Sequence, residues 1–416
     1  MEVYKFGGAS VKNANGVKNV ISVLKKTKSL DVLLVVSAMG KMTNAFEKIV
    51  DSYINNKGNL SKYIDEVMSF HQLILNNLFQ NKSLPIFKEI ELVFIGLSSY
   101  FINNKNKDYN YVYDQVVSLA EILSTKIISA YLNHNGVKNT WVDAKKHIKT
   151  DGNYREANVN WTTTNKNIQK LNNTSKLIIT QGFIASDQFG NTTTLGREGS
   201  DYTAAIFAYC LNAKSVTVFK DVAGVLNADP QLYDEVKLLS KISYREAIEM
   251  AFYGASVIHP KTLQPLQSKE IPLFVKSFID PLKKGTVIGR SIDLEPVLPC
   301  YIVKKNQILI SIATRDFSFM MEKNISEVFE LLHKHKLKVN LIQNTAISFS
   351  VCLEDKFNQL AHFLLILNAK YKVKYNNKTT LLTIRHFDKK SIEKVKATKV
   401  ILLQQISRET VQFILK

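Results

Sequence analysis

The first forty residues place the strongest constraint on the fold. VYKF (3–6) has the character of a short strand, GGAS follows as a glycine turn, and residues 11–26 repeat apolar positions with helical periodicity. The run DVLLVVSA (31–38) is continuously apolar, as a strand buried on both faces of a sheet should be. Strand, helix and strand joined by a right-handed crossover form a βαβ unit. This stretch therefore predicts an α/β protein with a mainly parallel sheet.

The remainder of the first 292 residues extends this pattern. Helical periodicity dominates about 41–135, which we interpret as a helical insertion on the sheet edge. Strand signals then return at 137–144, 176–185, 213–225 and 271–278, with helical stretches among them. Alternating strands and helices are typical of a doubly wound sheet. We expect one catalytic domain over residues 1–292.

The pattern changes in the region 300–416. A strand, an amphipathic helix and two strands are expected over about 306–355, and a second, shorter set of the same order over about 370–416. Two small βαββ units in tandem resemble ACT domains, which commonly sense amino acids. The sequence thus predicts a C-terminal α+β region with a regulatory role.

Composition limits the alternatives. The 416 residues, 45% hydrophobic, suffice for two or three domains, and the three cysteines lie far apart without metal-ligand spacing. The formal charge of +19 permits a nucleic-acid binder, but the lysines are scattered, so a general bias toward Lys, Asn and Ile is the preferred explanation. No signal region and no 18-residue apolar run occur. We expect a soluble, cytoplasmic protein that binds neither nucleic acid nor membrane.

One segment has the composition of an anion site. TTTLGREGSDYTAAIFA (192–208) places two glycines, an arginine and acidic groups before an alanine-rich run. Ser200 or Asp201 is expected to cap a helix beginning near Tyr202, and a helix start attracts anions. Arg197 adds a planar fork suited to a carboxylate. Alone, the segment equally permits a plain capped turn with a solvent-exposed arginine.

A second segment, KFGGAS (5–10), follows the first strand. A lysine ends the strand and paired glycines open the next helix. Backbone amides of Gly7, Gly8 and Ala9 are expected to cradle a phosphate that Lys5 neutralises. Neither the P-loop nor the dinucleotide-binding glycine pattern is present, so the glycine pair is weak evidence by itself.

A third segment, Val218–Pro230, carries Lys220 and Asp221 at the end of a predicted strand. Ligands of open α/β sheets bind at the carboxyl ends of strands, which makes both residues candidates. The alternative is an ion pair that only stabilises the loop.

These three segments, in this order, resemble the aspartate kinases of the amino-acid kinase family. The resemblance extends through VVSAMGKMTN, SLAEILST, EMAFYGASVIHPKTLQP and IPLFVKSFIDPLKKGTVI to the ACT-like pair, and so covers nearly the whole chain. It implies transfer of the γ-phosphoryl group of ATP to the β-carboxylate of L-aspartate, the first step toward lysine, threonine and methionine. ATP and Mg²⁺ are implied, although no metal ligand is assigned directly.

The resemblance implies roles for individual residues. The implied catalytic residues are Lys5 and Asp201. The implied aspartate contacts are Ser37, Thr43, Glu121, Arg197 and Ser200, with Arg197 holding the α-carboxylate and Glu121 the ammonium group. The implied ATP contacts are Lys5, Gly7, Gly8, Ser10, Lys220, Asp221, Leu226, Gln231 and Lys261.

Several positions depart from the family pattern. Ala9 and Ala120 replace a usual threonine and glycine, Glu198 stands where many members have glycine, and Lys220 replaces a common threonine. The other two departures are Gln231, where many members have arginine, and Ser256, where some have a lysine that meets ATP phosphates. These positions leave open which lysine meets the phosphates.

The chemistry needs charge neutralisation more than proton transfer. An aspartate carboxylate has an ordinary pKa of about 3.9, so it is already ionised at neutral pH and requires no general base. The reaction is difficult because the negatively charged carboxylate must approach a polyanion. Lysine, Mg²⁺ and backbone amides reduce this repulsion. The eight histidines show no metal spacing and are expected to be structural.

The ACT-like region implies feedback inhibition by lysine or threonine, in a homodimer. The effector candidates are Asp316, Phe317, Gln343 and Asn344. A fused homoserine dehydrogenase domain is not expected after Lys416. The alternatives are a kinase of glutamate or acetylglutamate, and a catalytically decayed amino-acid-binding regulator.

Overall fold

The computed structural model describes residues 1–29, 31–172, 176–255, 258–316 and 318–416. They form two compact units, and each is described by itself. The first unit consists of Met1–Val225, Leu238–Ile248 and Val257–Glu295. The second consists of Leu226–Lys237, Glu249–Ser256 and Pro296–Lys416.

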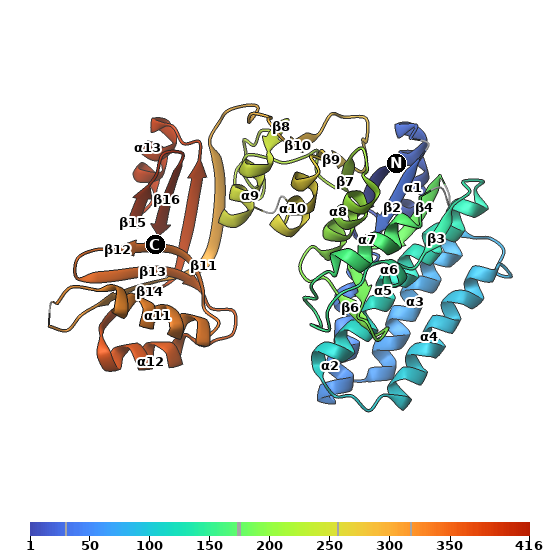
Figure 1. Cartoon of the computed structure of the whole chain (residues 1–416), viewed down its shortest axis with the longest axis horizontal. Coiled ribbons are helices and arrows are strands. Elements are labelled where there is room, and N and C mark those ends of the chain that lie inside the picture. Colours follow the sequence, from blue (N-terminus) through green and yellow to red (C-terminus); the bar gives the residue numbers. More distant parts are fainter. Residues whose placement is uncertain (30, 173–175, 256–257, 317) are drawn as a thin grey trace. The chain divides into compact units, whose positions relative to one another are not determined.

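An eight-stranded sheet organises the first unit (Figure 1). Its order is β3-β4-β2-β1-β7-β9-β10-β8. All pairs are parallel except β10 with β9, which confirms the mainly parallel α/β class. The strands are β1 (Glu2–Phe6), β2 (Val32–Val36), β3 (Thr140–Val142), β4 (Leu177–Gln181), β7 (Val216–Lys220), β8 (Lys241–Ser243), β9 (Leu273–Ser277) and β10 (Thr286–Gly289).

Five helices share one apolar core with this sheet. Helix α5 packs against β2, β3 and β4, so the helical insertion covers part of a sheet face, where the sequence suggested the sheet edge. By length and composition α5 could cross a membrane, but 72% of its most apolar window is buried inside the protein, as in a core helix. The helices are α1 (Ala14–Thr27), α2 (Met42–Asn55), α3 (Leu60–Leu78), α4 (Pro85–Asn103) and α5 (Tyr109–His134).

Shorter elements complete the first unit and lead into the second. A hairpin of β5 (Ile184–Ser186) and β6 (Thr192–Thr194) precedes α8 (Gly199–Leu211). The other helices are α6 (Ala144–His147), α7 (Trp161–Gln169), α9 (Tyr244–Tyr253), which spans the boundary between the units, and α10 (Pro260–Ser268).

The second unit is built on a six-stranded antiparallel sheet of order β12-β13-β11-β14-β16-β15. Its strands are β11 (Cys300–Ala313), β12 (Lys338–Asn344), β13 (Ser348–Glu354), β14 (Lys372–Arg385), β15 (Ile401–Ile406) and β16 (Thr410–Leu415). Its helices are α11 (Glu322–Lys334), α12 (Leu360–Lys370) and α13 (Lys389–Thr398).

Two long strands divide this sheet into halves. The register of β11 with β14 is interrupted between Lys304 and Leu309, and each strand contributes its two ends to different halves. The first half joins β12 and β13 under α11 and α12, and the second joins β15 and β16 under α13. The two ACT-like halves therefore share β11 and β14. This sharing differs from the tandem arrangement that the sequence predicted. Helix α12 belongs to the first half.

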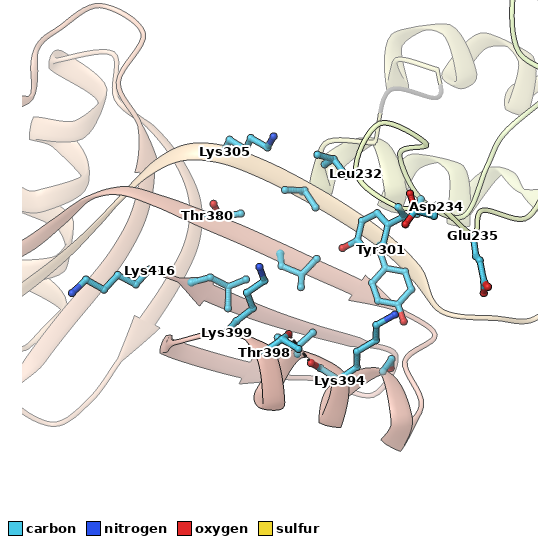
Figure 2. Close-up of a pocket in the computed structure, with 17 residues that line it drawn as sticks. Leu232, Asp234, Glu235, Tyr301, Lys305, Thr380, Lys394, Thr398, Lys399 and Lys416 are labelled. Atoms are coloured by element: carbon cyan, nitrogen blue, oxygen red, sulfur yellow. Dashed lines mark hydrogen bonds between the residues drawn. The ribbon is translucent and has the colours of Figure 1, made fainter.

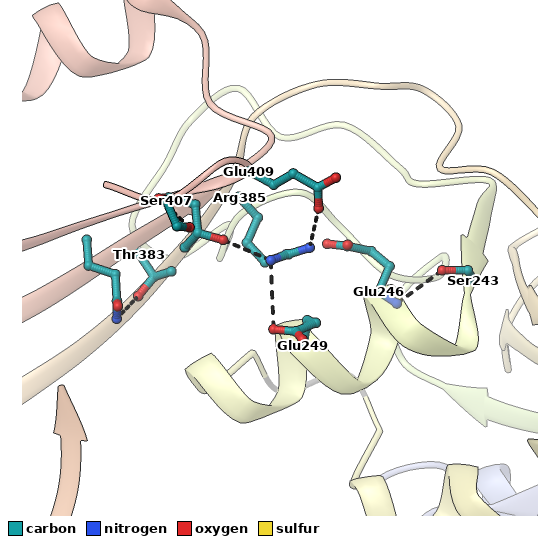
Figure 3. A network of polar contacts seen from close by, with 9 residues as sticks. Ser243, Glu246, Glu249, Thr383, Arg385, Ser407 and Glu409 are labelled. Atoms are coloured by element: carbon teal, nitrogen blue, oxygen red, sulfur yellow. Dashed lines mark hydrogen bonds and ion pairs between the residues drawn. The ribbon is translucent and has the colours of Figure 1, made fainter. Parts of the chain in front are cut away.

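An arginine ties α9 to the second half of this sheet. Arg385, on β14, is buried and donates to Thr410 Oγ1 at 2.8 Å and to Glu409 Oε2 at 3.3 Å (Figure 3). Its guanidinium also lies 3.8 Å from Glu249 Oε2 on α9. A buried guanidinium needs such partners to offset its lost hydration, so this network fixes the end of α9 against the sheet.

Candidate active site

The carboxyl ends of the parallel strands gather the predicted site residues at one edge of the sheet. Lys5 lies on β1 between Val35 of β2 and Val218 of β7. The following turns therefore begin side by side, as open α/β sheets require for a ligand site. Lys220 ends β7 at this same edge and is half-buried, while Asp221 after it is exposed.

A buried ion pair lies at the centre of this edge. Lys5 Nζ is 2.7 Å from Asp201 Oδ1, and the two side chains are only 11% and 5% exposed. Asp201 belongs to the first turn of α8, where the helix dipole favours a negative charge. The lysine is thus held at a fixed place by a partner that is itself stabilised by the helix.

The glycine turn after β1 is locked to the turn after β2. Gly8 O accepts a hydrogen bond from Gly40 N at 2.9 Å. A Cβ atom on Gly8 would lie 2.7 Å from Ala38 O and 2.8 Å from Gly40 O, which are backbone atoms. Gly8 is therefore required for the close approach of the two turns, and Ser10, buried behind them, donates its amide to Gly7 O at 3.0 Å.

We expect Gly8→Ala to destabilise the protein by about 1–3 kcal/mol, because overpacking against backbone atoms forces them apart. Gly7→Ala is the matched control, because within 4 Å its added methyl would meet only Lys5 Nζ, at 3.4 Å, which is an ordinary van der Waals distance. Urea unfolding of both variants measures the difference. Equal losses of stability in the two variants would contradict the assigned packing.

A buried carboxylate lies beside the ion pair. Glu121, near the middle of α5, is 3% exposed, and among the described residues its Oε2 has no hydrogen-bond partner. Burial raises the pKa of Glu121 to about 8, while the backbone amide of Ala38 and the charge of Lys5 oppose the rise. An unpartnered buried carboxylate is costly unless a ligand supplies a donor, and an ammonium group would meet this need.

The other predicted aspartate contacts lie in the turn after β2 and at the starts of α2 and α8. Ser124 Oγ donates to Ser37 O at 2.7 Å, which ties α5 to the turn after β2. Thr43 lies in the first turn of α2 and is half-buried. Ser200, in the first turn of α8, packs so closely on Gly182 that a Cβ there would lie 2.4 Å from Ser200 Cβ. The predicted aspartate contacts thus come from neighbouring turns of one unit.

The turn before α8 differs from the prediction. The helix begins at Gly199, three residues before Tyr202, so Ser200 and Asp201 lie in its first turn and do not cap it. Glu198 occupies the cap position with a left-handed φ of 53°, and its Oε2 accepts a hydrogen bond from His259 N at 2.8 Å. Because the carboxylate is directed to His259, it forms no side-chain cap, and Arg197 before it is exposed.

Sequence reasoning missed a buried aspartate that fixes this turn. Asp114 Oδ2 accepts hydrogen bonds from the amides of Arg155 and Thr194, each at 2.9 Å, and its Oδ1 accepts one from Thr194 Oγ1 at 2.7 Å. Asp114 lies on the same helix as Glu121, and Thr194 ends the strand that leads to Arg197. Asp114 therefore connects α5, which carries Glu121, to the strand that leads to Arg197. Glu121 and Arg197 are the predicted contacts to the ammonium and α-carboxylate groups of the substrate.

We expect Asp114→Ala to destabilise the protein by about 1–3 kcal/mol, because two amides and a hydroxyl would lose their buried acceptor. Asp114→Asn is the matched control, since its amide oxygen can replace Oδ2 and its NH₂ can donate to Thr194 Oγ1. Burial raises the pKa of Asp114 to about 6 from its usual 3.8. The folded state thus retains a proton that the unfolded chain has lost, so wild-type stability falls as pH rises from about 4 to 6, and the asparagine variant lacks this component.

The remaining candidates are more dispersed. Lys261, in the first turn of α10, is half-buried within the first unit. Leu226 and Gln231 belong to the second unit, and Ser256 and Phe317 lie outside the described residues. Asp316 is exposed and accepts hydrogen bonds from the amide and hydroxyl of Ser318, which lower its pKa. Gln343 and Asn344 end β12.

The described residues include no cluster of three or more His, Cys, Asp or Glu side chains placed to hold a metal ion. Mg²⁺ keeps several waters and binds through phosphates and one or two carboxylates. Asp201 and Glu121 are buried carboxylates of the site, and Asp221 is exposed at the same edge of the sheet.

Comparison with known proteins places the chain in a family. The sequence model of the amino acid kinase family matches residues 1–277. The chain therefore belongs to the amino acid kinase family. Its similar relatives are aspartokinases, which confirms the resemblance: lysine-sensitive aspartokinase 3 of Escherichia coli is 30% identical, over 85% of this chain and 78% of that one. The aspartokinase of Chlamydia pneumoniae is 27% identical, over 92% and 84%.

Solved structures agree with these relatives. Aspartokinase III of Escherichia coli in complex with lysine and aspartate, its T-state, has a TM-score of 0.81 and 27% identity over 100% of this chain and 95% of that chain. The same enzyme with aspartate and ADP, its R-state, has a TM-score of 0.83 and 26% identity over 100% and 96%. The similarity spans both units, so the expected α/β fold with an ACT-like C-terminal region is confirmed.

Proposed function

We propose that this chain is an aspartate kinase that transfers the γ-phosphoryl group of ATP to the β-carboxylate of L-aspartate, giving 4-phospho-L-aspartate and ADP. The observation that carries the proposal is the buried Lys5–Asp201 pair beside the unpartnered carboxylate of Glu121. The kinship with aspartokinases supports the same reaction. A decayed regulator is not favoured, because these charged groups lie together in one buried site.

The proposed chemistry follows from charge. A β-carboxylate oxygen forms a bond to the γ-phosphorus as the bond from that phosphorus to the bridging oxygen of ADP breaks, and no proton is removed. Lys5 and the amides of the glycine turn neutralise the transferring group, and Asp201 orients the lysine. Mg²⁺, bound with ATP, supplies further positive charge. Glu121 receives the ammonium group of aspartate and Arg197 its α-carboxylate.

The proposal also includes feedback regulation by an amino acid. The relative from Escherichia coli is named lysine-sensitive. Its complex with lysine and aspartate is a T-state, and its complex with aspartate and ADP is an R-state. We expect lysine or threonine to inhibit this chain through the ACT-like unit, near Asp316, Gln343 and Asn344, in a homodimer. A cytoplasmic location remains a prediction.

The test is aspartate-dependent formation of ADP by the purified protein, with glutamate and N-acetylglutamate as alternative acceptors. ADP formation with aspartate alone is expected. Activity only with glutamate or its acetyl derivative would identify another amino acid kinase, and no turnover with any acceptor would favour the decayed regulator. Adding millimolar lysine or threonine to the same assay tests feedback inhibition. An unchanged rate with both amino acids would refute the proposed regulation.

A further inference from the structure

A cavity of about 790 Å³ opens within the second unit (Figure 2), and none of the residues placed in the proposed active site lines it. All of its lining residues belong to this unit. They come from the segment 228–235, from β11 and β14, from β16 with Lys416 after it, and from α13 with Lys399 after it. The volume is typical of small-molecule sites, which measure roughly 300–1,000 Å³.

The cavity arises from how the second half of the sheet is covered. In the first half, α11 and α12 together bury the apolar core. In the second half, the described residues supply one helix, α13, over the core that includes Leu382 and Val395. The edge of this core forms an apolar floor, with Val303, Leu382 and Leu415 lining the cavity. Part of the apolar face is thus left for a ligand to cover.

The segment 228–235 forms the opposite wall and is firmly attached. Asn227 donates its side-chain amide to Pro299 O at 3.0 Å and accepts a hydrogen bond from Lys237 N at 2.7 Å. Its carbonyl accepts the amide of Tyr301 at 2.7 Å. These bonds hold the segment to the start of β11, so the cavity is a built feature of the unit.

Aromatic rings and cations line the same cavity. The rings of Tyr233 and Tyr301 lie 5.1 Å apart, inclined by 33°, and offer a surface on which a flat ring can stack. Lys394 on α13 and Lys399 just after it extend toward the sheet from the side of the helix (Figure 2). Lysine ammonium groups are effective partners for phosphate. Asp234 beside the rings can accept hydrogen bonds from sugar hydroxyls or an amino group.

We propose that this cavity binds a mononucleotide, with the base on the Tyr233–Tyr301 pair and the phosphate at Lys394 and Lys399. A mononucleotide unites the three features that the walls require: a flat ring, hydroxyl groups and a compact dianion. Because the cavity wall includes Ala228 and Leu232, an occupant would touch the segment that carries the predicted ATP contacts Leu226 and Gln231. Occupancy should therefore change the KM for ATP, a consequence that rests on the proposed function.

Photolabelling of the full chain with 8-azido-AMP tests the binding without requiring turnover. The informative product is the tryptic peptide 291–304, which carries Tyr301 and none of the predicted ATP contacts. We expect mass spectrometry to find label on this peptide, displaced by excess AMP. In the double variant Lys394→Glu/Lys399→Glu, labelling should fall at least about tenfold, because each change replaces attraction of the phosphate by repulsion.

Lys396→Glu is the matched control, since Lys396 is exposed on the same helix but does not line the cavity. It should keep its labelling within about twofold of wild type, because an exposed charge outside the cavity is screened by solvent and salt. Label confined to peptides of the glycine turn, or an equal loss in the control, would overturn the proposal. Labelling of 291–304 in a protein without aspartate kinase activity would uphold the site and refute only the proposed function.

Discussion

Replacing Lys5 by methionine reduces kcat by about a thousandfold, because the transferring phosphoryl group loses a preorganised positive charge. Lys5 is buried, and its ammonium group is held 2.7 Å from Asp201, so its positive charge has a fixed place in the site. The KM for aspartate should change much less, since its ammonium and α-carboxylate groups are assigned to Glu121 and Arg197. Initial rates at saturating ATP and aspartate measure this effect.

The same substitution leaves Asp201 buried without its partner, which typically costs about 3–5 kcal/mol of stability. Lys5→Met/Asp201→Asn removes both charges and should restore much of the melting temperature without restoring turnover. Lys18→Met, an exposed lysine on α1, serves as the control for loss of charge. A folded double variant whose kcat stays within tenfold of wild type would exclude the assigned role of Lys5.

Much of the site could be anticipated because parallel strands bring distant segments to one edge. The sequence predicted both the strand that carries Lys5 and the strand that carries Lys220, and these two strands are neighbours in the sheet. Glu121 was different: nothing in the periodicity of a long apolar helix marks one glutamate as a ligand, and only the family resemblance identified it. Its burial and unpartnered oxygen are visible only in the structure.

Other features could not be inferred, for physical reasons that can be named. The start of α8 depends on the left-handed conformation of Glu198, which a glutamate seldom adopts and which a contact with His259 supports. Asp114 contacts residues about forty and eighty positions away in the sequence, so no local pattern marks it. The sharing of β11 and β14 depends on an irregular register near Lys304, which composition does not encode.

The carboxylate of Glu121 should govern how strongly the enzyme binds aspartate. Glu121→Gln keeps the shape of the side chain but removes the charge that pairs with the substrate ammonium. Loss of one partner from a buried charge pair costs about 2–5 kcal/mol in binding, so we expect the KM for aspartate to rise about a hundredfold or more. Glu91→Gln, which alters an exposed glutamate on α4, is the control.

The raised pKa of Glu121 gives this prediction a second, independent readout. With a pKa of about 8 in the absence of ligand, about a tenth of Glu121 is ionised at pH 7 and about half at pH 8. Because the ammonium group binds the ionised form, aspartate affinity should increase about fivefold between these pH values and release a proton. Calorimetric titration in two buffers of different ionisation enthalpy measures both quantities, and the glutamine variant should lose the pH dependence.

Stability should respond to pH in the opposite direction. The ordinary pKa of a glutamate is 4.5, so between about pH 4.5 and 8 the folded protein retains a proton that the unfolded chain has released. Wild-type stability therefore falls as pH rises through this window, whereas Glu121→Gln, which cannot ionise, avoids the loss. The ligand-free variant should melt at a higher temperature than wild type at pH 8 and at a similar one near pH 4.5. A variant that binds aspartate as tightly as wild type, or that gains no stability at pH 8, would show that Glu121 is not a buried carboxylate reserved for the substrate.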